Sequence, residues 1–165
     1  MVPKQTHMKL PKSVPERLGA ILNRIPMHCR MTDYVISAAE GMPRGFTMIA
    51  YALASYPKYK LLNRGGQHIY WYRLGAKLGD YMAAYHLGQC YEVGRGVPQN
   101  MKMAVHWWNV AAAYDYPLAL TALGAAYYNG SGVRRDVKKA LGLYGQAALS
   151  GDRVARRMLN KLDWV

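Results

Sequence analysis

The sequence predicts an all-α protein: a short right-handed α-solenoid of helix–turn–helix repeats with an N-terminal helical capping region. Two observations indicate this fold class. The second half of the chain matches itself at an offset of 36 residues, and the apolar residues of each period recur at helical spacing, without strand-like alternation. Because a helical pair of this length cannot bury its own apolar face, neighbouring copies are expected to stack on one another.

Residues 1–15 are predicted to form a basic flexible arm, since they contain three lysines, three prolines and no acid. Prolines divide residues 16–65 into short helices, which are expected at about Glu16–Ile25, Thr32–Glu40 and Phe46–Tyr56. In one interpretation the last of these is a degenerate repeat helix that pairs with the next predicted helix, and the others cap the solenoid. In the alternative, residues 1–65 form a separate docking arm.

Residues 66–165 are predicted to hold the repeats and to end in a basic helix. One helix is expected at Gly66–Leu78, and the first full repeat pairs a helix at Tyr81–Tyr91 with one at Met101–Tyr114. Glycines supply the left-handed backbone of the turns, and an Asn or Asp precedes the second helix of each pair as an N-cap. The residues concerned are Gly94, Gly96 and Asn100 in the first repeat, and Gly130, Gly132 and Asp136 in the second.

The repeat has a specific motif. The segment L-G-x-x-Y-x-x-G-x-G-V-P-Q-N at Leu87–Asn100, followed by A-x-x-W-W-x-x-A-A at Ala104–Ala112, resembles the Sel1-like repeat, a relative of the tetratricopeptide repeat. The resemblance covers about residues 66–165. The chain departs from the usual pattern at Asp115, where a glycine commonly ends the helix. It also has Gly142 and Gly145 inside a helix, which should loosen that helix by roughly 1 kcal/mol each.

This resemblance implies that the first helix of each repeat, helix A, lines a concave face where partners bind. The variable helix A positions are therefore the candidate partner-binding residues: Tyr85, His86, Gln89, Glu92, Thr121, Tyr128 and Asn129. Most other aromatic residues occupy repeat positions and are interpreted as packing residues. The resemblance further implies the roles of known members, which are adaptors, scaffolds and assembly factors, tied in bacteria to secretion, host interaction or effector–immunity pairs.

Charge adds a second group of candidates. The net charge of +13 is uneven: +7 over residues 1–65, +1 over 66–133 and +5 over 134–165. The basic residues near the C-terminus are expected to gather at one end of the solenoid and to contact an acidic partner. The candidates among them are Arg134, Arg135, Arg153, Arg156 and Arg157. A solvated polar cap is the plainer interpretation of the same residues.

Residues for catalysis or metal binding are scarce. The five histidines are scattered without metal-ligand spacing, and the two cysteines are too few for a disulfide scaffold. The adjacent His28 and Cys29 would need a third group to form a nucleophilic site, and Cys90 is interpreted as an inert core residue. The turn Gly94-x-Gly96 lacks the third glycine of a dinucleotide loop. No catalytic residue, metal or cofactor is therefore predicted.

The sequence thus favours a non-catalytic protein–protein interaction module with an acidic protein partner. The alternative is nucleic-acid binding through the basic termini, although the chain contains no known nucleic-acid module. No secretory signal is apparent, and the longest mostly apolar run, Phe46–Tyr56, falls short of the roughly 20 residues that span a bilayer. A cytoplasmic protein without a membrane span is expected, and its oligomeric state is left open.

Overall fold

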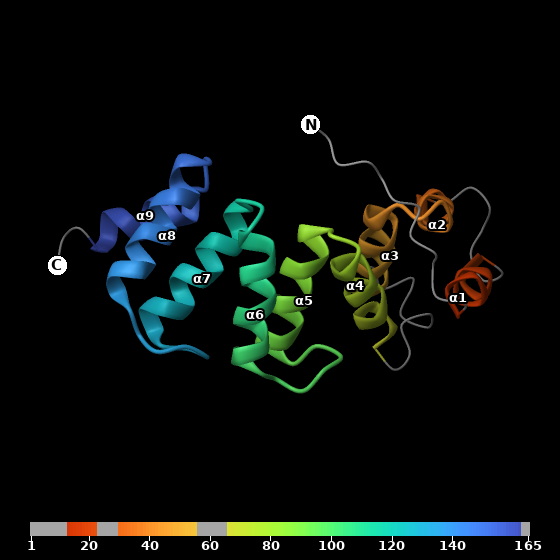
Figure 1. Cartoon of the computed structure of the whole chain (residues 1–165), viewed down its shortest axis with the longest axis horizontal. Helices are drawn as coiled ribbons and strands as arrows, with labels where there is room; N and C mark the ends of the chain where they lie inside the picture. Colours follow the sequence, from red (N-terminus) through yellow and green to blue (C-terminus); the bar gives the residue numbers. More distant parts are fainter. Residues whose placement is uncertain (1–12, 23–29, 56–65, 163–165) are drawn as a thin grey trace. The chain divides into compact units, whose positions relative to one another are not determined.

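The computed structural model describes residues 13–22, 30–55 and 66–162, and every regular element within these ranges is an α-helix (Figure 1). The predicted all-α solenoid is confirmed, while its handedness stays a prediction. The helices are α1 Ser13–Leu22, α2 Arg30–Ala39, α3 Pro43–Ser55, α4 Gln67–Lys77, α5 Tyr81–Val93, α6 Met101–Ala112, α7 Pro117–Asn129, α8 Val137–Leu149 and α9 Arg153–Leu162. None of them is long and apolar enough to cross a membrane.

The chain forms two compact units, which comprise residues 1–78 and 79–165. In the first unit, α1 to α4 pack in chain order, each against the next helix. In the second unit, α5 to α9 do the same. This sequential packing is what a repeat array requires, because each helix pair buries its apolar face against its neighbours.

In the first unit, α3 packs against α4, as the degenerate-repeat interpretation expects. Phe46 and Trp71 stack in parallel between these helices, with ring centroids 6.0 Å apart. Tyr72, which is 3% exposed, aligns at the 36-residue offset with Trp108 in the next copy. The α3–α4 pair therefore resembles a complete repeat, yet its contacts group α4 with α1–α3, so the predicted boundary at residue 66 stays a prediction.

Helix boundaries in the first unit lie upstream of the predicted ones. Helix α1 begins at Ser13 and α3 begins at Pro43, where a proline fits because the first residue of a helix needs no intrahelical donor. Each predicted helix of residues 16–65 is nevertheless present. The predicted basic arm lies almost wholly outside the described residues.

In the second unit, the turns of the two complete repeats match closely. Gly94 and Gly130 end α5 and α7 with φ angles of 74° and 72°, a left-handed conformation that glycine adopts without strain. The Asn100 side chain accepts a hydrogen bond from the Met103 amide at 3.1 Å, and Asp136 accepts one from the Lys139 amide at 2.9 Å. The predicted turns and N-caps are confirmed.

Each repeat packs a helix B aromatic ring onto a helix A glycine. The Trp108 ring lies on Gly88, where any Cβ atom would collide with the indole. Equally, a Cβ on Gly124 would lie 2.8 Å from the Tyr144 ring. Both rings are buried, with Trp108 2% and Tyr144 1% exposed. Close approach of the two helices therefore depends on glycine at this position of helix A.

Two departures from the repeat pattern have structural consequences. Helix α6 ends at Ala112, two residues before the predicted end, because the following turn makes shorter-range hydrogen bonds and places Asp115 at a φ of 54°. In contrast, α8 is unbroken across Gly142 and Gly145, and a Cβ at either position would meet nothing within 4 Å. These two glycines therefore serve no packing purpose among the described residues.

Candidate functional site

The chemistry expected of a catalytic site is not visible in the described residues. Cys90 is buried, and burial raises the pKa of its thiol to about 11, so this side chain stays protonated and unreactive near neutral pH. No group of three His, Cys, Asp or Glu residues within the described ranges is placed to hold a metal ion. His28 and Cys29 lie outside the described residues.

Helices α5, α7 and α9 are the A helices of the second unit, and equivalent positions on them form three rows. Each row stays partly or fully accessible to solvent along its length, whereas the row of Ala83, Ala119 and Ala155 on the opposite side of these helices is fully buried at 0% exposure. We call the three accessible rows the helix A face. They consist of Tyr81, Pro117 and Arg153; of Tyr85, Thr121 and Arg157; and of Gln89, Ala125 and Lys161.

The α5 part of this face is aromatic. Tyr116, which precedes α7, lies against the rings of Tyr81 and Tyr85, at centroid distances of 5.2 Å and 5.3 Å. Tyr114 joins them, 5.9 Å from Tyr81. We call these four residues the tyrosine cluster. Its rings are half-buried or exposed, so they present apolar surface together with polar hydroxyl groups.

A short hydrogen-bond chain holds three of the four predicted residues of α5 in place. Gln89 donates from Nε2 to the Tyr85 hydroxyl at 3.0 Å, and its Oε1 lies 3.1 Å from His86 Nδ1. Burial lowers the pKa of His86 and raises the pKa of Tyr85, so both stay uncharged near neutral pH. The three predicted residues therefore form one neutral, pre-ordered polar group.

The remaining helix A candidates are less accessible than the sequence suggested. The Thr121 hydroxyl oxygen is buried and has no hydrogen-bond partner among the described residues. Glu92 is half-buried, and burial raises the pKa of its carboxyl group. Tyr128 is also half-buried, and only Asn129 is fully exposed.

Arg135 interacts with its own repeat. Its Nε donates to the Tyr128 carbonyl at 3.0 Å, and its guanidinium lies 5.8 Å from the centroid of the Tyr128 ring. In the first repeat, Gln99 at the equivalent position donates to the Glu92 carbonyl at 2.8 Å. The shared hydrogen bond satisfies a carbonyl at the end of helix A, which explains a long donor side chain at this position.

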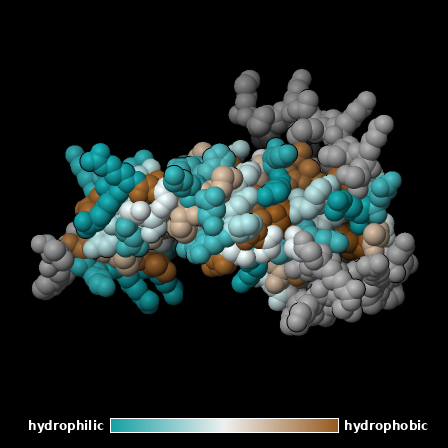
Figure 2. Space-filling view, turned by 90° about the horizontal axis from the view of Figure 1, so that it is seen from below, coloured by the Kyte–Doolittle hydropathy of each residue, from teal (hydrophilic) through white to brown (hydrophobic). Residues whose placement is uncertain are grey.

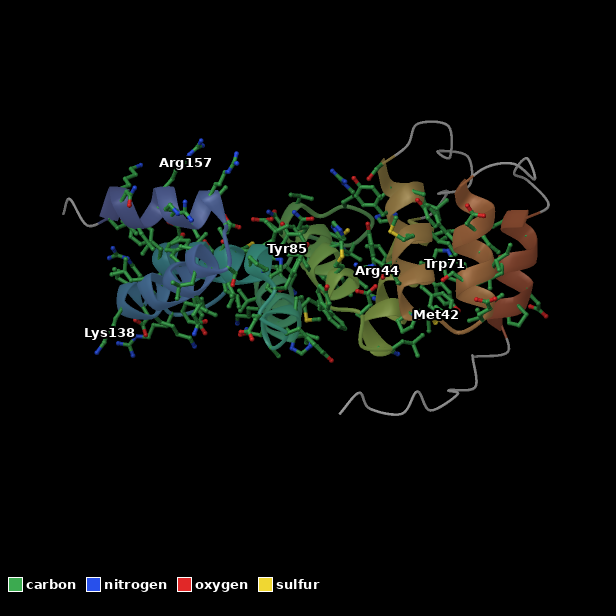
Figure 3. All side chains as sticks on the ribbon, turned by 90° about the horizontal axis from the view of Figure 1, so that it is seen from above. Met42, Arg44, Trp71, Tyr85, Lys138 and Arg157 are labelled. Atoms are coloured by element: carbon green, nitrogen blue, oxygen red, sulfur yellow. The ribbon has the colours of Figure 1, made fainter. Side chains whose placement is uncertain are left out.

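The C-terminal basic residues fall into two groups along the chain, one on α9 and one on α8 and the turn before it, and the member of each group labelled in Figure 3 lies on an opposite side of the part that contains α8 and α9. Figure 3 shows Arg157 on one side and Lys138 on the other, and Figure 2 shows hydrophilic side chains on both sides. We call them the α9 group and the turn group. The α9 group is Arg153, Arg156, Arg157 and Lys161, and the turn group is Arg134, Arg135, Lys138 and Lys139.

Little negative charge opposes these groups. Within residues 134–162 the only acids are Asp136 and Asp152, and both accept hydrogen bonds from backbone amides at the start of a helix. Asp152 accepts from the amides of Val154 at 2.7 Å and Ala155 at 3.0 Å. All eight cationic side chains of the two groups are exposed.

The sequence identified the aromatic and basic residues but missed two features of this surface. It did not identify the partnership of Tyr81 and Tyr85 with Tyr114 and Tyr116, which follow α6. It also did not separate the basic residues into two groups. The repeat does carry a signal for the grouping of the basic residues, because two steps of the 36-residue offset align Arg153, Arg157 and Lys161 with Tyr81, Tyr85 and Gln89.

Comparison with known proteins supports the repeat assignment. Residues 69–80, 82–113 and 117–152 match the Sel1 repeat family. A Sel1 repeat protein from Oxalobacter formigenes is similar in structure, with a TM-score of 0.71 and 26% identity over 80% of this chain and 98% of that one. No curated protein matches the chain.

Two further solved structures share the fold. The first is c5321, a protective antigen of uropathogenic Escherichia coli with an SLR fold, at a TM-score of 0.69 and 28% identity over 76% of this chain. This chain spans 26% of the length of c5321. The second is Helicobacter pylori cysteine rich protein B, at a TM-score of 0.58 and 17% identity over 81% of this chain and all of that one. Sel1 repeats generally mediate protein–protein interaction. Because the sequence motif, the turns and the solved relatives agree, this chain belongs to the Sel1-like repeat family.

Proposed function

We propose that this protein is a non-catalytic interaction module that binds a partner protein with an acidic surface, in an adaptor, scaffold or assembly role. The observation that carries the proposal is the helix A face, where accessible rows lie on helices whose opposite residues are fully buried. The tyrosine cluster on α5 supplies large apolar contacts, and the α9 group supplies positive charge. Aromatic residues and arginines are the residue types that contribute most to protein interfaces.

Two further observations support a binding role over catalysis. The buried thiol of Cys90 is held protonated, and burial favours the uncharged forms of Tyr85 and His86, which Gln89 joins in one hydrogen-bond chain. A pre-ordered surface of this kind favours binding, because little side-chain entropy is lost when a partner docks.

Affinity capture tests the proposed surface. The full chain carrying Tyr81→Ala, Tyr85→Ala, Arg153→Ala and Arg157→Ala should lose partners that the unchanged chain retains. A matched control carries Lys102→Ala and His106→Ala, which remove two exposed side chains of α6. Partners retained equally by all three chains would contradict the assigned surface.

Nucleic-acid binding is the second candidate, and the eight exposed cations of α8, α9 and their preceding turn favour it. It predicts an affinity that falls steeply with salt, with each neutralised phosphate adding about 0.9 to the logarithmic slope on duplex DNA. A salt titration against duplex and single-stranded DNA measures this slope. The Debye length is about 10 Å near 100 mM salt, so contacts with phosphates still attract at this ionic strength. Absence of binding under these conditions would exclude nucleic-acid binding.

A further inference from the structure

The α9 group contains a stripe that continues the helix A face. Arg153, Arg157 and Lys161 are spaced four residues apart, so they lie on one side of the helix, one above another. We call them the basic stripe. Arg156 is separate from it, because its equivalents Ala84 and Leu120 are 0% and 3% exposed and therefore face the interior of the complete repeats. Arg156 thus occupies a capping position, whereas the stripe occupies the binding rows.

The basic stripe has no purpose visible within the described part of the chain. Like charges four residues apart on a helix repel one another and destabilise it. No hydrogen bond or ion pair to these three side chains is seen among the described residues. Asp152, the nearest acid within the described residues, caps the helix, and Asp163 lies outside them. An anionic partner would relieve the repulsion, which is a reason to place a ligand there.

The same rows end in the tyrosine cluster at α5. Tyr81 and Tyr85 occupy the positions of Arg153 and Arg157, two helix A steps away. The rows therefore run from the tyrosine cluster on α5, across α7, to the basic stripe on α9. An extended peptide covers about 3.3 Å per residue, so a short segment of a partner chain can reach both sites along these rows.

We propose that the helix A face binds an extended acidic segment of a partner protein, with carboxylates on the basic stripe and an apolar side chain on the tyrosine cluster. This inference rests on the proposed interaction function. It adds the direction in which the partner segment lies along the face and the chemistry of that segment, and it leaves the turn group outside the binding surface. A second copy of this chain fits poorly, because a net charge of +13 opposes self-association through a basic surface.

The test uses the full chain and fluorescence anisotropy with a labelled synthetic peptide. The peptide carries one Trp and three Glu residues separated by a flexible linker of Gly and Ser residues. Arg157→Glu with Lys161→Glu is the test variant. Arg134→Glu with Lys138→Glu is the matched control, with the same change in charge on the turn group. The dissociation constant is expected to rise at least tenfold for the test variant and less than threefold for the control.

A second arm tests the apolar anchor. Tyr85→Ala should weaken binding of the Trp peptide at least fivefold and leave a peptide with Ser in place of Trp almost unchanged. Circular dichroism checks that each variant is folded, and Arg157→Gln with Lys161→Gln replaces the double glutamate variant if that one unfolds.

Three outcomes overturn this inference. They are equal losses for the test and control variants, no binding of the Trp peptide at millimolar concentration, and tighter binding of a single-stranded oligonucleotide of equal charge. The first two leave the proposed interaction function standing, because a different acidic partner could dock elsewhere on the chain and still be captured. The third favours the nucleic-acid alternative.

Discussion

The two complete repeats, α5–α6 and α7–α8, share their buried and turn positions but differ on their accessible helix A face. Both have a glycine under an aromatic ring, a left-handed glycine at the end of helix A and a side-chain N-cap on helix B. On the accessible rows, however, the first repeat has Tyr85 and Gln89 where the second has Thr121 and Ala125. Shared positions therefore account for folding, and the variable rows are where partner binding is to be sought.

The largest effect is expected at the glycine–aromatic contact. Gly88→Ala forces a methyl group into Trp108, and Gly124→Ala forces one towards Tyr144, 2.8 Å away. Overpacking of this kind destabilises by about 1–3 kcal/mol, and we expect Gly88→Ala to lie at the upper end because its collision is closer. Urea unfolding measures the free energy of unfolding of both variants. Equal, negligible effects would show that the two helices separate without penalty.

The N-caps test whether the repeats are equally dependent on their turns. Asn100→Ala and Asp136→Ala each remove the acceptor for one helix B amide, so each should lower the free energy of unfolding by about 1 kcal/mol. Thermal unfolding of the two variants gives the comparison. If only one of the two variants lowered the free energy of unfolding, the two caps would differ in energy despite their matching geometry.

The glycines of α8 should respond in the opposite direction. Gly142→Ala and Gly145→Ala place a methyl group in open space on an intact helix, so each should raise the free energy of unfolding by about 0.5–1 kcal/mol. Gly124→Ala is the matched control, because it introduces the same group at a crowded position. Destabilisation by Gly142→Ala measured in urea would mean that this face of α8 is covered.

The smallest effect is expected at Cys90. Cys90→Ala gives the first repeat the residue of the second, since Ala126 occupies the equivalent position. Removing one buried sulfur should lower the free energy of unfolding by less than about 1 kcal/mol, comparable to one methylene group. In a Cys29→Ser background, Cys90 should react slowly with iodoacetamide at pH 8, because its thiol pKa is about 11. Rapid labelling of the folded chain would contradict the burial.

Much of the fold was predictable because the repeat is apparent from the sequence alone. The 36-residue offset located the turns at Gly94 and Gly130, and the caps at Asn100 and Asp136. The early end of α6 was not predictable, since Asp115 adopts a left-handed conformation that the sequence pattern assigns to glycine. Helix ends near Pro15 and Pro43 were misplaced because prolines fit the first turn of a helix as well as the gap before it.

The candidate site was only partly predictable. The residue types were apparent, but a stretch of basic residues does not show which side of a helix end each one occupies, and Arg135 could not be recognised as a brace for the Tyr128 carbonyl. The tyrosine cluster joins residues that are 35 positions apart, from Tyr81 to Tyr116, so it depends on packing between helices. Aligning the accessible rows at the repeat offset recovers most of this information.

The central claim, that the helix A face is the partner-binding surface, is tested most directly by site-specific photo-crosslinking. The photoreactive residue p-benzoylphenylalanine replaces Tyr85 or Lys161 on the face, or Lys102 on α6 as the control. In extracts of the organism that makes the protein, the same crosslinked partner is expected at Tyr85 and Lys161 and not at Lys102. Crosslinking at Lys102 alone would contradict the account.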